Sequence, residues 1–175
     1  MEELRYPIGR FKCPQPITKE DVANFINEIA RLPTLIEEAV EGLNDQQLNT
    51  PYRDGGWTVR QVVHHLADSH TNSYVRFKWA ATEDKPVIKA YFEDRWATLA
   101  DARVAPVSIS LHFLTALHAR WVYFLRSLTE EALNREFIHP ESGEAIDLKR
   151  NIALYAWHGN HHLAHITNLK EREGW

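Results

Sequence analysis

Hydrophobic residues recur at helical spacing in four long stretches of this 175-residue chain. Apolar positions three and four apart share one face of a helix, so each stretch predicts an amphipathic helix. The predicted helices cover about 18–43, 58–81, 108–127 and 147–173. Four such helices joined by turns predict an all-α four-helix bundle, because each apolar stripe must be buried against another helix.

Polar residues mark where these helices should begin. The sequences TKED at 18–21 and TVRQ at 58–61 have the spacing of a capping box, in which the first and fourth residues bond each other's backbone N–H. Ser108 and Asp147 are the expected caps of the other two helices. Pro33 lies inside the first stretch, so we expect a kink there or a split into two pieces.

The connecting segments carry turn residues. The first sixteen residues include three prolines and no helical period, which predicts an extended arm, and NTPYRDGGW at 49–57 predicts a loop. A short amphipathic piece is expected at about 88–96. IHPESGEAIDL at 138–148 is a turn-rich connection with room for a small hairpin. No repeat or low-complexity segment divides the chain, so we expect one domain over residues 1–175 with short extra helices.

Composition and charge narrow the class of protein. The chain is 44% hydrophobic and 25% charged, as globular proteins are, and its net charge of −4 without a basic stripe argues against a nucleic-acid partner. No apolar run approaches the roughly 20 residues of a membrane span, and the first residues lack the pattern of a signal peptide. The single cysteine, Cys13, excludes an internal disulfide and is expected to be a free thiol. We therefore expect a cytoplasmic protein without a membrane partner.

Histidines concentrate in the last predicted helix, where WHGNHHLAHI at 157–166 contains four. Residues i and i+4 share a face, so His158/His162 and His161/His165 are both candidate metal-binding pairs. A wheel at about 100° per residue places His162 near the middle of the apolar arc and His158 at its edge, but turns His161 about 120° away. His165 is intermediate. The arc itself consists of Leu148, Asn151, Ile152, Tyr155, Ile166 and Leu169. The wheel favours His158 with His162.

A third ligand could come from WTVRQVVHHLADSH at 57–70. The same wheel directs His64 away from the core and places His65 and His70 at opposite edges of the inward face. Choosing between these two requires the relative direction of the helices, so both remain candidates. The other histidines are expected at the core edge, on the surface or in a loop: His112, His118 and His139.

The two histidine blocks, with the opening YPIGRF, resemble the DinB-like superfamily and in particular its YfiT branch. The resemblance extends over essentially the whole chain. It implies a four-helix bundle with up-down-down-up connectivity, a homodimer, and one divalent ion per chain, zinc or nickel. It also implies the ligands: the histidine immediately before LAD, which is His65, and the pair His158 and His162.

Three histidines leave at least one coordination position open, as in catalytic sites, and water bound there can have a pKa near 7. The resemblance therefore implies a metal-dependent hydrolase that acts on a small-molecule substrate through metal-bound water. The same position could hold the thiolate of a low-molecular-weight thiol such as bacillithiol, which makes a thiol S-transferase the alternative. Two non-enzymatic alternatives are a metal-binding stress-response bundle and a regulatory bundle whose histidines sense pH.

Several other residues are weaker candidates. Gly159 could clear space beside the open metal position or allow two helices to pack closely. Asp68, Asn151 and Asn160 could orient the ligand imidazoles as hydrogen-bond acceptors. A carboxylate or phosphate on the substrate could bind basic residues that would otherwise form solvated helix faces: Arg60, Arg76 and Lys78.

Overall fold

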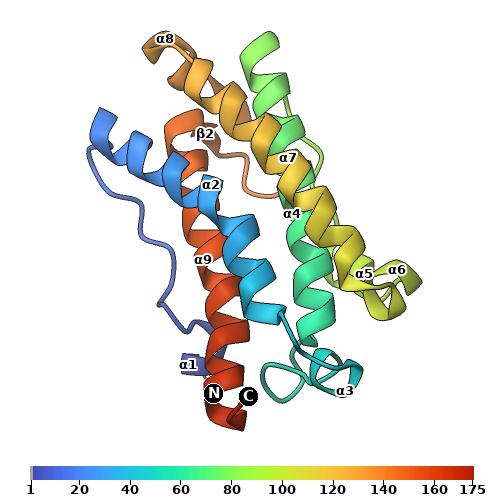
Figure 1. Ribbon diagram of the computed structural model, residues 1–175. Coiled ribbons are helices and arrows are strands. Elements are labelled where there is room, and N and C mark those ends of the chain that lie inside the picture. The colour runs from blue at the N-terminus through green and yellow to red at the C-terminus, as the bar shows by residue number, and fades with distance from the viewer. Residues whose placement is uncertain (1) are drawn as a thin grey trace.

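The computed structural model describes residues 2–175, and four long helices form its body (Figure 1). These are α2 (Lys19–Val40), α4 (Val59–Thr82), α7 (Val107–Ser127) and α9 (Leu148–Glu173). Short helices lie in the connections: α1 (Glu2–Arg5), α3 (Asp45–Leu48), α5 (Glu93–Trp96), α6 (Ala100–Val104) and α8 (Glu130–Leu133). Strands β1 (Glu136–Ile138) and β2 (Ala145–Asp147) form the antiparallel hairpin that the turn-rich segment allows.

The four long helices have the expected connectivity. In Figure 1, α2 and α9 run from the top of the view to the bottom, whereas α4 and α7 run from the bottom to the top. The long connection between α4 and α7 makes this possible, because it returns the chain to the lower end before α7 begins. α2 contacts both α9 and α7, and α4 contacts both α7 and α9. The bundle is therefore up-down-down-up.

Two clusters of buried apolar side chains fill the bundle, one towards each end. One contains Phe77, Trp121 and Ile152, and the other contains Leu66 and Ile166. Between them, the facing helices bury several polar side chains: His65, His70, Ser73, His118 and His162. A histidine-rich layer thus separates the two apolar clusters.

Local sequence explains most helix boundaries. Thr18 and Thr58 both form the predicted capping boxes, and the Asp147 side chain accepts from the backbone N–H of Arg150. The prediction that Ser108 caps the third helix is wrong. That helix begins at Val107, with Pro106 at the cap position, so Ser108 lies in its first turn. α2 continues through Pro33 and is not split there.

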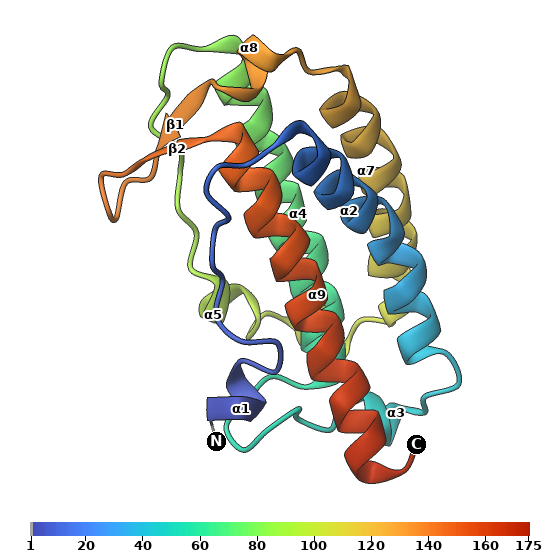
Figure 2. The ribbon, with the colours of Figure 1, turned by 90° about the vertical axis from the view of Figure 1, so that its left-hand side faces the viewer.

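Two connecting segments differ from their predictions. The N-terminal arm is not extended throughout, since Glu2–Arg5 form α1 before Pro7. Helix between 88 and 96 is confined to α5, because Ile88 is extended and its N–H bonds the carbonyl of Ile138, 3.1 Å away. In Figure 2 the N-terminal segment runs alongside α9 from α1 to the start of α2. Between residues 2 and 175, no helix has both the length and the apolar character needed to cross a membrane.

Candidate metal centre

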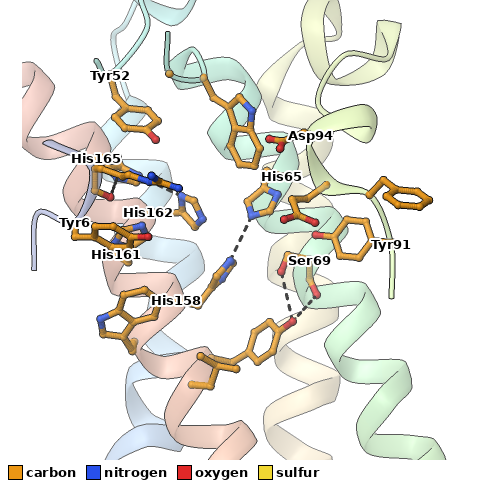
Figure 3. Close-up of a pocket in the computed structure, with 18 of the residues that line it drawn as sticks. Tyr6, Tyr52, His65, Ser69, Tyr91, Asp94, His158, His161, His162 and His165 are labelled. Atoms are coloured by element: carbon orange, nitrogen blue, oxygen red, sulfur yellow. Dashed lines mark hydrogen bonds between the residues drawn. The ribbon is translucent and has the colours of Figure 1, made fainter. Parts of the chain in front are cut away.

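His65 on α4 faces His158 and His162 on α9 across the bundle (Figure 3). The Nε2 atoms of His65 and His158 are 3.3 Å apart. One ring nitrogen from each of the three residues lies within 4.8 Å of the other two. His65 and His162 are buried, and His158 is half-buried. The structure thus brings together the three residues that the resemblance implies as ligands.

The spacing of these nitrogens suits one divalent ion. Nitrogens about 2.0–2.1 Å from a zinc ion lie about 3.3 Å apart when the angle at the metal is tetrahedral. The distance between the Nε2 atoms of His65 and His158 matches that value. Three neutral imidazoles that converge in this way fit zinc or nickel, both of which accept nitrogen ligands.

Burial keeps these imidazoles neutral. It lowers the pKa of His65 to about 3, with help from the nearby His161 and His165. It also holds the pKa values of His158 and His162 well below the ordinary value of 6.5, and neighbouring histidines lower them further. A protonated imidazole cannot bind a metal ion, so all three rings are ready to act as ligands at neutral pH.

A cavity of about 760 Å³ opens beside the three histidines. Its walls come from the N-terminal segment, the loop before α4, α4 itself, the segment around α5, the hairpin loop and α9. The Trp57 indole lies against His65, with ring centroids 4.5 Å apart, and stacks on His162. The cavity is large enough for a small molecule, and Trp57 restricts the rotation of two of the rings that face it.

Polar groups also face this cavity. The Tyr155 hydroxyl lies 3.5 Å from the Ser69 hydroxyl and 3.4 Å from the Ser69 carbonyl oxygen. Tyr91 lines the same wall, and burial raises the pKa of its hydroxyl, which therefore remains protonated at neutral pH. The Tyr155 hydroxyl donates to the Ser69 carbonyl, whereas the Tyr91 hydroxyl can donate a hydrogen bond to a bound molecule.

His161 and His165 form a second trio with His162, again with ring nitrogens within 4.8 Å of one another. The Nδ1 atoms of His162 and His165 are 3.3 Å apart. His161 stacks on Trp157, and His165 stacks on Tyr52 with ring centroids 3.8 Å apart. The sequence predicts His161 and His165 as a pair but does not place them around His162. The i, i+4 spacing was the available signal.

His70 lies behind His158 rather than beside the other two ligand candidates. Its Nε2 is 3.1 Å from Nδ1 of His158, on the side of that ring opposite Nε2. Its own Nδ1 is 2.8 Å from Nε2 of His118. The expectation that His118 lies at the core edge or surface is wrong, since its side chain is buried between α2 and α4. His112 is exposed, and His139 lies in the hairpin loop at the cavity wall.

The expectation that His64 points away from the core also needs correction. It turns away from the ligand candidates, but the start of α7 and the segment before it cover this face of α4. His64 is buried there, with Nδ1 2.7 Å from the Ser110 hydroxyl and Nε2 3.1 Å from the Ala105 carbonyl.

The weaker candidates have mostly structural surroundings. A Cβ atom at Gly159 would lie 2.5 Å from Cδ2 of Leu32, which favours close packing of α9 on α2 over space for a metal ligand. Asn160 bonds Glu28, and the buried guanidinium of Arg60 pairs with the exposed Asp45 in α3. Of the three basic candidates, Arg76 alone lines the cavity. In the described part of the chain, no hydrogen bond joins a ligand candidate to any of the three expected acceptors: Asp68, Asn151 and Asn160.

Comparisons with known proteins identify the family of this chain. The family model of the DinB superfamily matches residues 28–166. A protein of Bacillus cereus (strain 03BB102), named "Putative metal-dependent hydrolase", is 54% identical to this chain over 175 residues. The match covers 100% of both chains. A Bacillus thuringiensis subsp. konkukian (strain 97-27) protein described in the same words has the same identity and coverage.

A solved structure is also similar. It is that of YfiT from Bacillus subtilis, described as "a probable metal-dependent hydrolase with an unusual four-helix bundle topology". It superposes with a TM-score of 0.97 at 50% sequence identity, and the match covers 99% of each chain.

Proposed function

This chain belongs to the DinB superfamily and is YfiT-like, and from this we propose that it is a metal-dependent hydrolase. His65, His158 and His162 would bind one divalent ion, zinc or nickel. When bound, such an ion lowers the pKa of a coordinated water and supplies hydroxide at neutral pH. The relatives' names support the general class, and the finer assignment of ligands and chemistry is our proposal.

The observation that carries the proposal is the convergence of three neutral imidazoles at one wall of a cavity. Nε2 of His65 lies 3.3 Å from Nε2 of His158, as two ligands of one zinc ion would. Among the described residues, His65, His158 and His162 form one set of three donors, and three donors leave a coordination position for a reactant, as in catalytic rather than structural sites.

The residues around the cavity have defined tasks in this proposal. Trp57 packs on the rings of His65 and His162 and excludes water from that side. The hydroxyl group of Tyr91 faces the same space and can donate to an oxygen atom on which negative charge develops. Arg76 is placed to bind an anionic part of the substrate.

Metal content tests the ligand assignment. Protein purified without a histidine tag should contain about one zinc or nickel ion per chain by elemental analysis. His65→Ala, His158→Ala and His162→Ala should each weaken zinc binding more than about 100-fold, beyond the effect of outer hydrogen-bond partners. His112→Ala is the matched control, because His112 is exposed on α7, and should retain the ion. Retention of the ion by all three ligand variants would overturn the assignment.

Activity assays then separate the candidate reactions. The metal-loaded protein is offered a panel of small esters and amides, and separately a chlorinated aromatic electrophile with and without a low-molecular-weight thiol. Hydrolysis that needs no thiol and disappears in His162→Ala supports the proposal. Turnover of the electrophile only with thiol would indicate the S-transferase alternative, which uses the same ion. Bound metal without either activity would indicate the non-catalytic bundle.

A further inference from the structure

We propose that buried histidines outside the ligand set act as positioning residues for the two ligands on α9. His70, backed by His118, would fix the ring of His158, and His165 would fix the ring of His162. This inference rests on the proposed function, because it concerns the same metal site. The observation behind it is that both series of hydrogen bonds end on a backbone carbonyl oxygen, which can only accept.

The first series starts at the carbonyl oxygen of Ile29, 2.7 Å from Nδ1 of His118. Nδ1 must donate there, so in a neutral ring Nε2 of His118 accepts from Nδ1 of His70, 2.8 Å away. Nε2 of His70 in turn accepts from Nδ1 of His158 at 3.1 Å. The proton of His158 therefore resides on Nδ1. Its Nε2 keeps a free lone pair, and this is the atom 3.3 Å from His65.

Pro33 explains why the Ile29 carbonyl is available. In a regular helix, the carbonyl of residue 29 accepts from the N–H of residue 33, but proline has no N–H. Pro33 lies inside α2 with its ring buried, and the carbonyl it leaves without a helical partner is the one that accepts from His118. A proline that costs α2 one backbone hydrogen bond thus provides the acceptor for the buried histidines.

The second series is shorter. The carbonyl oxygen of Arg5 lies 3.2 Å from Nε2 of His165, so Nε2 donates. Nδ1 of His165 then accepts from Nδ1 of His162, 3.3 Å away, which leaves Nε2 of His162 free for the metal. The Tyr52 ring, stacked on His165, holds that imidazole in place. Folding of α1 against α9 therefore contributes directly to the orientation of a ligand.

Burial supports this assignment of protons. Both His70 and His118 are almost fully inaccessible to solvent, and burial lowers the pKa of His118 to about 4. Both rings are therefore neutral at neutral pH, and each has one donor and one acceptor nitrogen. Partners on the outer nitrogen of a metal-binding histidine fix its tautomer and orientation, and their loss commonly costs 10–100-fold in metal affinity.

A second metal ion on His161, His162 and His165 is the competing explanation of the same cluster. It would require His162 to bind two ions, one through each nitrogen, and it would displace the hydrogen bond from His162 to His165. Hydrogen bonds explain both contacts of His165, with the Arg5 carbonyl and with His162, and they need no second cation. We therefore favour hydrogen bonding over a second metal ion.

The tautomers can be measured without any metal. The full-length metal-free protein, labelled with ¹⁵N-histidine, is examined by NMR, and couplings between ring nitrogens and carbon-bound protons report which nitrogen carries the proton. We expect His158 and His162 to be protonated at Nδ1. Protonation at Nε2 in both rings would overturn the inference. This measurement uses the wild-type chain, so it does not depend on whether a variant folds.

Zinc affinity tests the consequence. His70→Phe keeps a buried ring but removes both nitrogens, and we expect zinc affinity, measured by competition with a chelator, to fall about 10–100-fold. His70→Gln should restore it to within a few-fold, because an amide can both accept from His158 and donate to His118. His165→Phe should weaken binding by a similar factor while the stack on Tyr52 remains.

His64→Phe is the matched control. His64 is a buried, hydrogen-bonded histidine on the same helix, but its partners are Ser110 and Ala105 rather than a ligand. The His64→Phe variant should keep the zinc affinity of the wild type, even where the substitution lowers thermal stability. Equal affinities in His70→Phe and wild type would overturn the inference for His158, and two ions per chain would overturn it for His162. If the wild type binds no zinc, the proposed function fails, whereas the tautomer measurement still decides the inference.

Discussion

His64 and His65 are neighbours on α4 with nearly equal exposure, 5% and 6%, yet their ring nitrogens meet different atoms. His64 uses both nitrogens in hydrogen bonds, to the Ser110 hydroxyl and to the Ala105 carbonyl. His65 instead presents Nε2 to Nε2 of His158, and two lone pairs that face each other need a proton or a cation between them. At the scale of the residue, the partner atoms separate a structural histidine from a candidate ligand, whereas burial does not.

Arg60 provides a prediction at the same scale. Its guanidinium is buried and bonds the Asn49 side chain at 3.0 Å, the Ala105 carbonyl at 2.9 Å and Asp45 at 2.6 Å. It therefore ties α3 and the segment before α7 to α4 rather than binding a substrate. Arg60→Met should lower the free energy of unfolding in urea by about 2 kcal/mol, because buried hydrogen bonds to a charged group are lost. Zinc affinity should not change.

The outcome that would contradict this role is equally specific. If Arg60→Met kept wild-type stability but raised KM for a substrate found in the activity panel, Arg60 would be a substrate contact. Lys78→Met is the control, since Lys78 lies over the Phe124 ring on the bundle surface and should change stability by no more than about 0.5 kcal/mol.

The contact between α9 and α2 depends on the missing side chain of Gly159. Alanine there would gain about 1 kcal/mol of helix propensity. Its Cβ would lie 2.5 Å from Cδ2 and 3.3 Å from Cγ of Leu32, which is itself buried and has little room to move. Overpacking of this kind costs about 1–3 kcal/mol, so we expect Gly159→Ala to be net destabilising by about 1 kcal/mol in thermal or urea unfolding.

Gly159→Ala should also weaken zinc binding, because displacement of α9 from α2 moves the adjacent His158. Thr167→Ala, at an exposed position of α9, controls for the effect of alanine on the helix and should leave both quantities unchanged. A more stable Gly159→Ala protein would show that Leu32 can shift aside without cost.

Local sequence predicted the elements whose boundaries depend on local contacts. The capping boxes of Thr18 and Thr58 involve residues three apart, and both form. Ile88 was misjudged because its extended conformation depends on a hydrogen bond to Ile138, fifty residues away in sequence. Likewise, the choice of His65 over His70 depends on the antiparallel arrangement of α4 and α9. Residue spacing within one helix does not specify the direction of another helix.

His64 and His118 were misplaced for another physical reason. A helical wheel with one apolar arc assumes that a helix buries one face. In this bundle, α7 contacts α2 on one side and α4 on the other, and α4 contacts both α7 and α9. Polar residues beside the apolar arc are then buried too, and they must find hydrogen-bond partners in another helix, as His118 does at Ile29 and His70.

At the scale of the whole molecule, the histidine layer between the two apolar clusters should make stability depend on pH. In the metal-free protein, burial lowers the pKa of His118, His161 and His165 to about 4 in each case. The unfolded chain binds protons at these residues below pH 6.5, but the folded protein does not until about pH 4. The free energy of unfolding should therefore fall as the pH decreases from 6.5 to 4, by up to about 1.4 kcal/mol per pH unit for each histidine.

Comparison of variants isolates the contribution of one residue. Asp68 acts in the opposite direction, since burial and the nearby Asp101 raise its pKa to about 6, but it is common to all variants and cancels in differences. His118→Gln keeps a donor for Ile29 and an acceptor for His70 yet cannot bind a proton, so its unfolding free energy should decrease less steeply between pH 6.5 and 4 than that of the wild type. His112→Gln, at an exposed position, should follow the wild-type curve.

Urea unfolding at several pH values in the presence of a chelator measures all three slopes. If the His118→Gln curve stayed parallel to the wild-type curve, His118 would have to accept a proton as readily in the folded protein as in the unfolded chain. The neutral hydrogen-bond series behind His158 would then not hold.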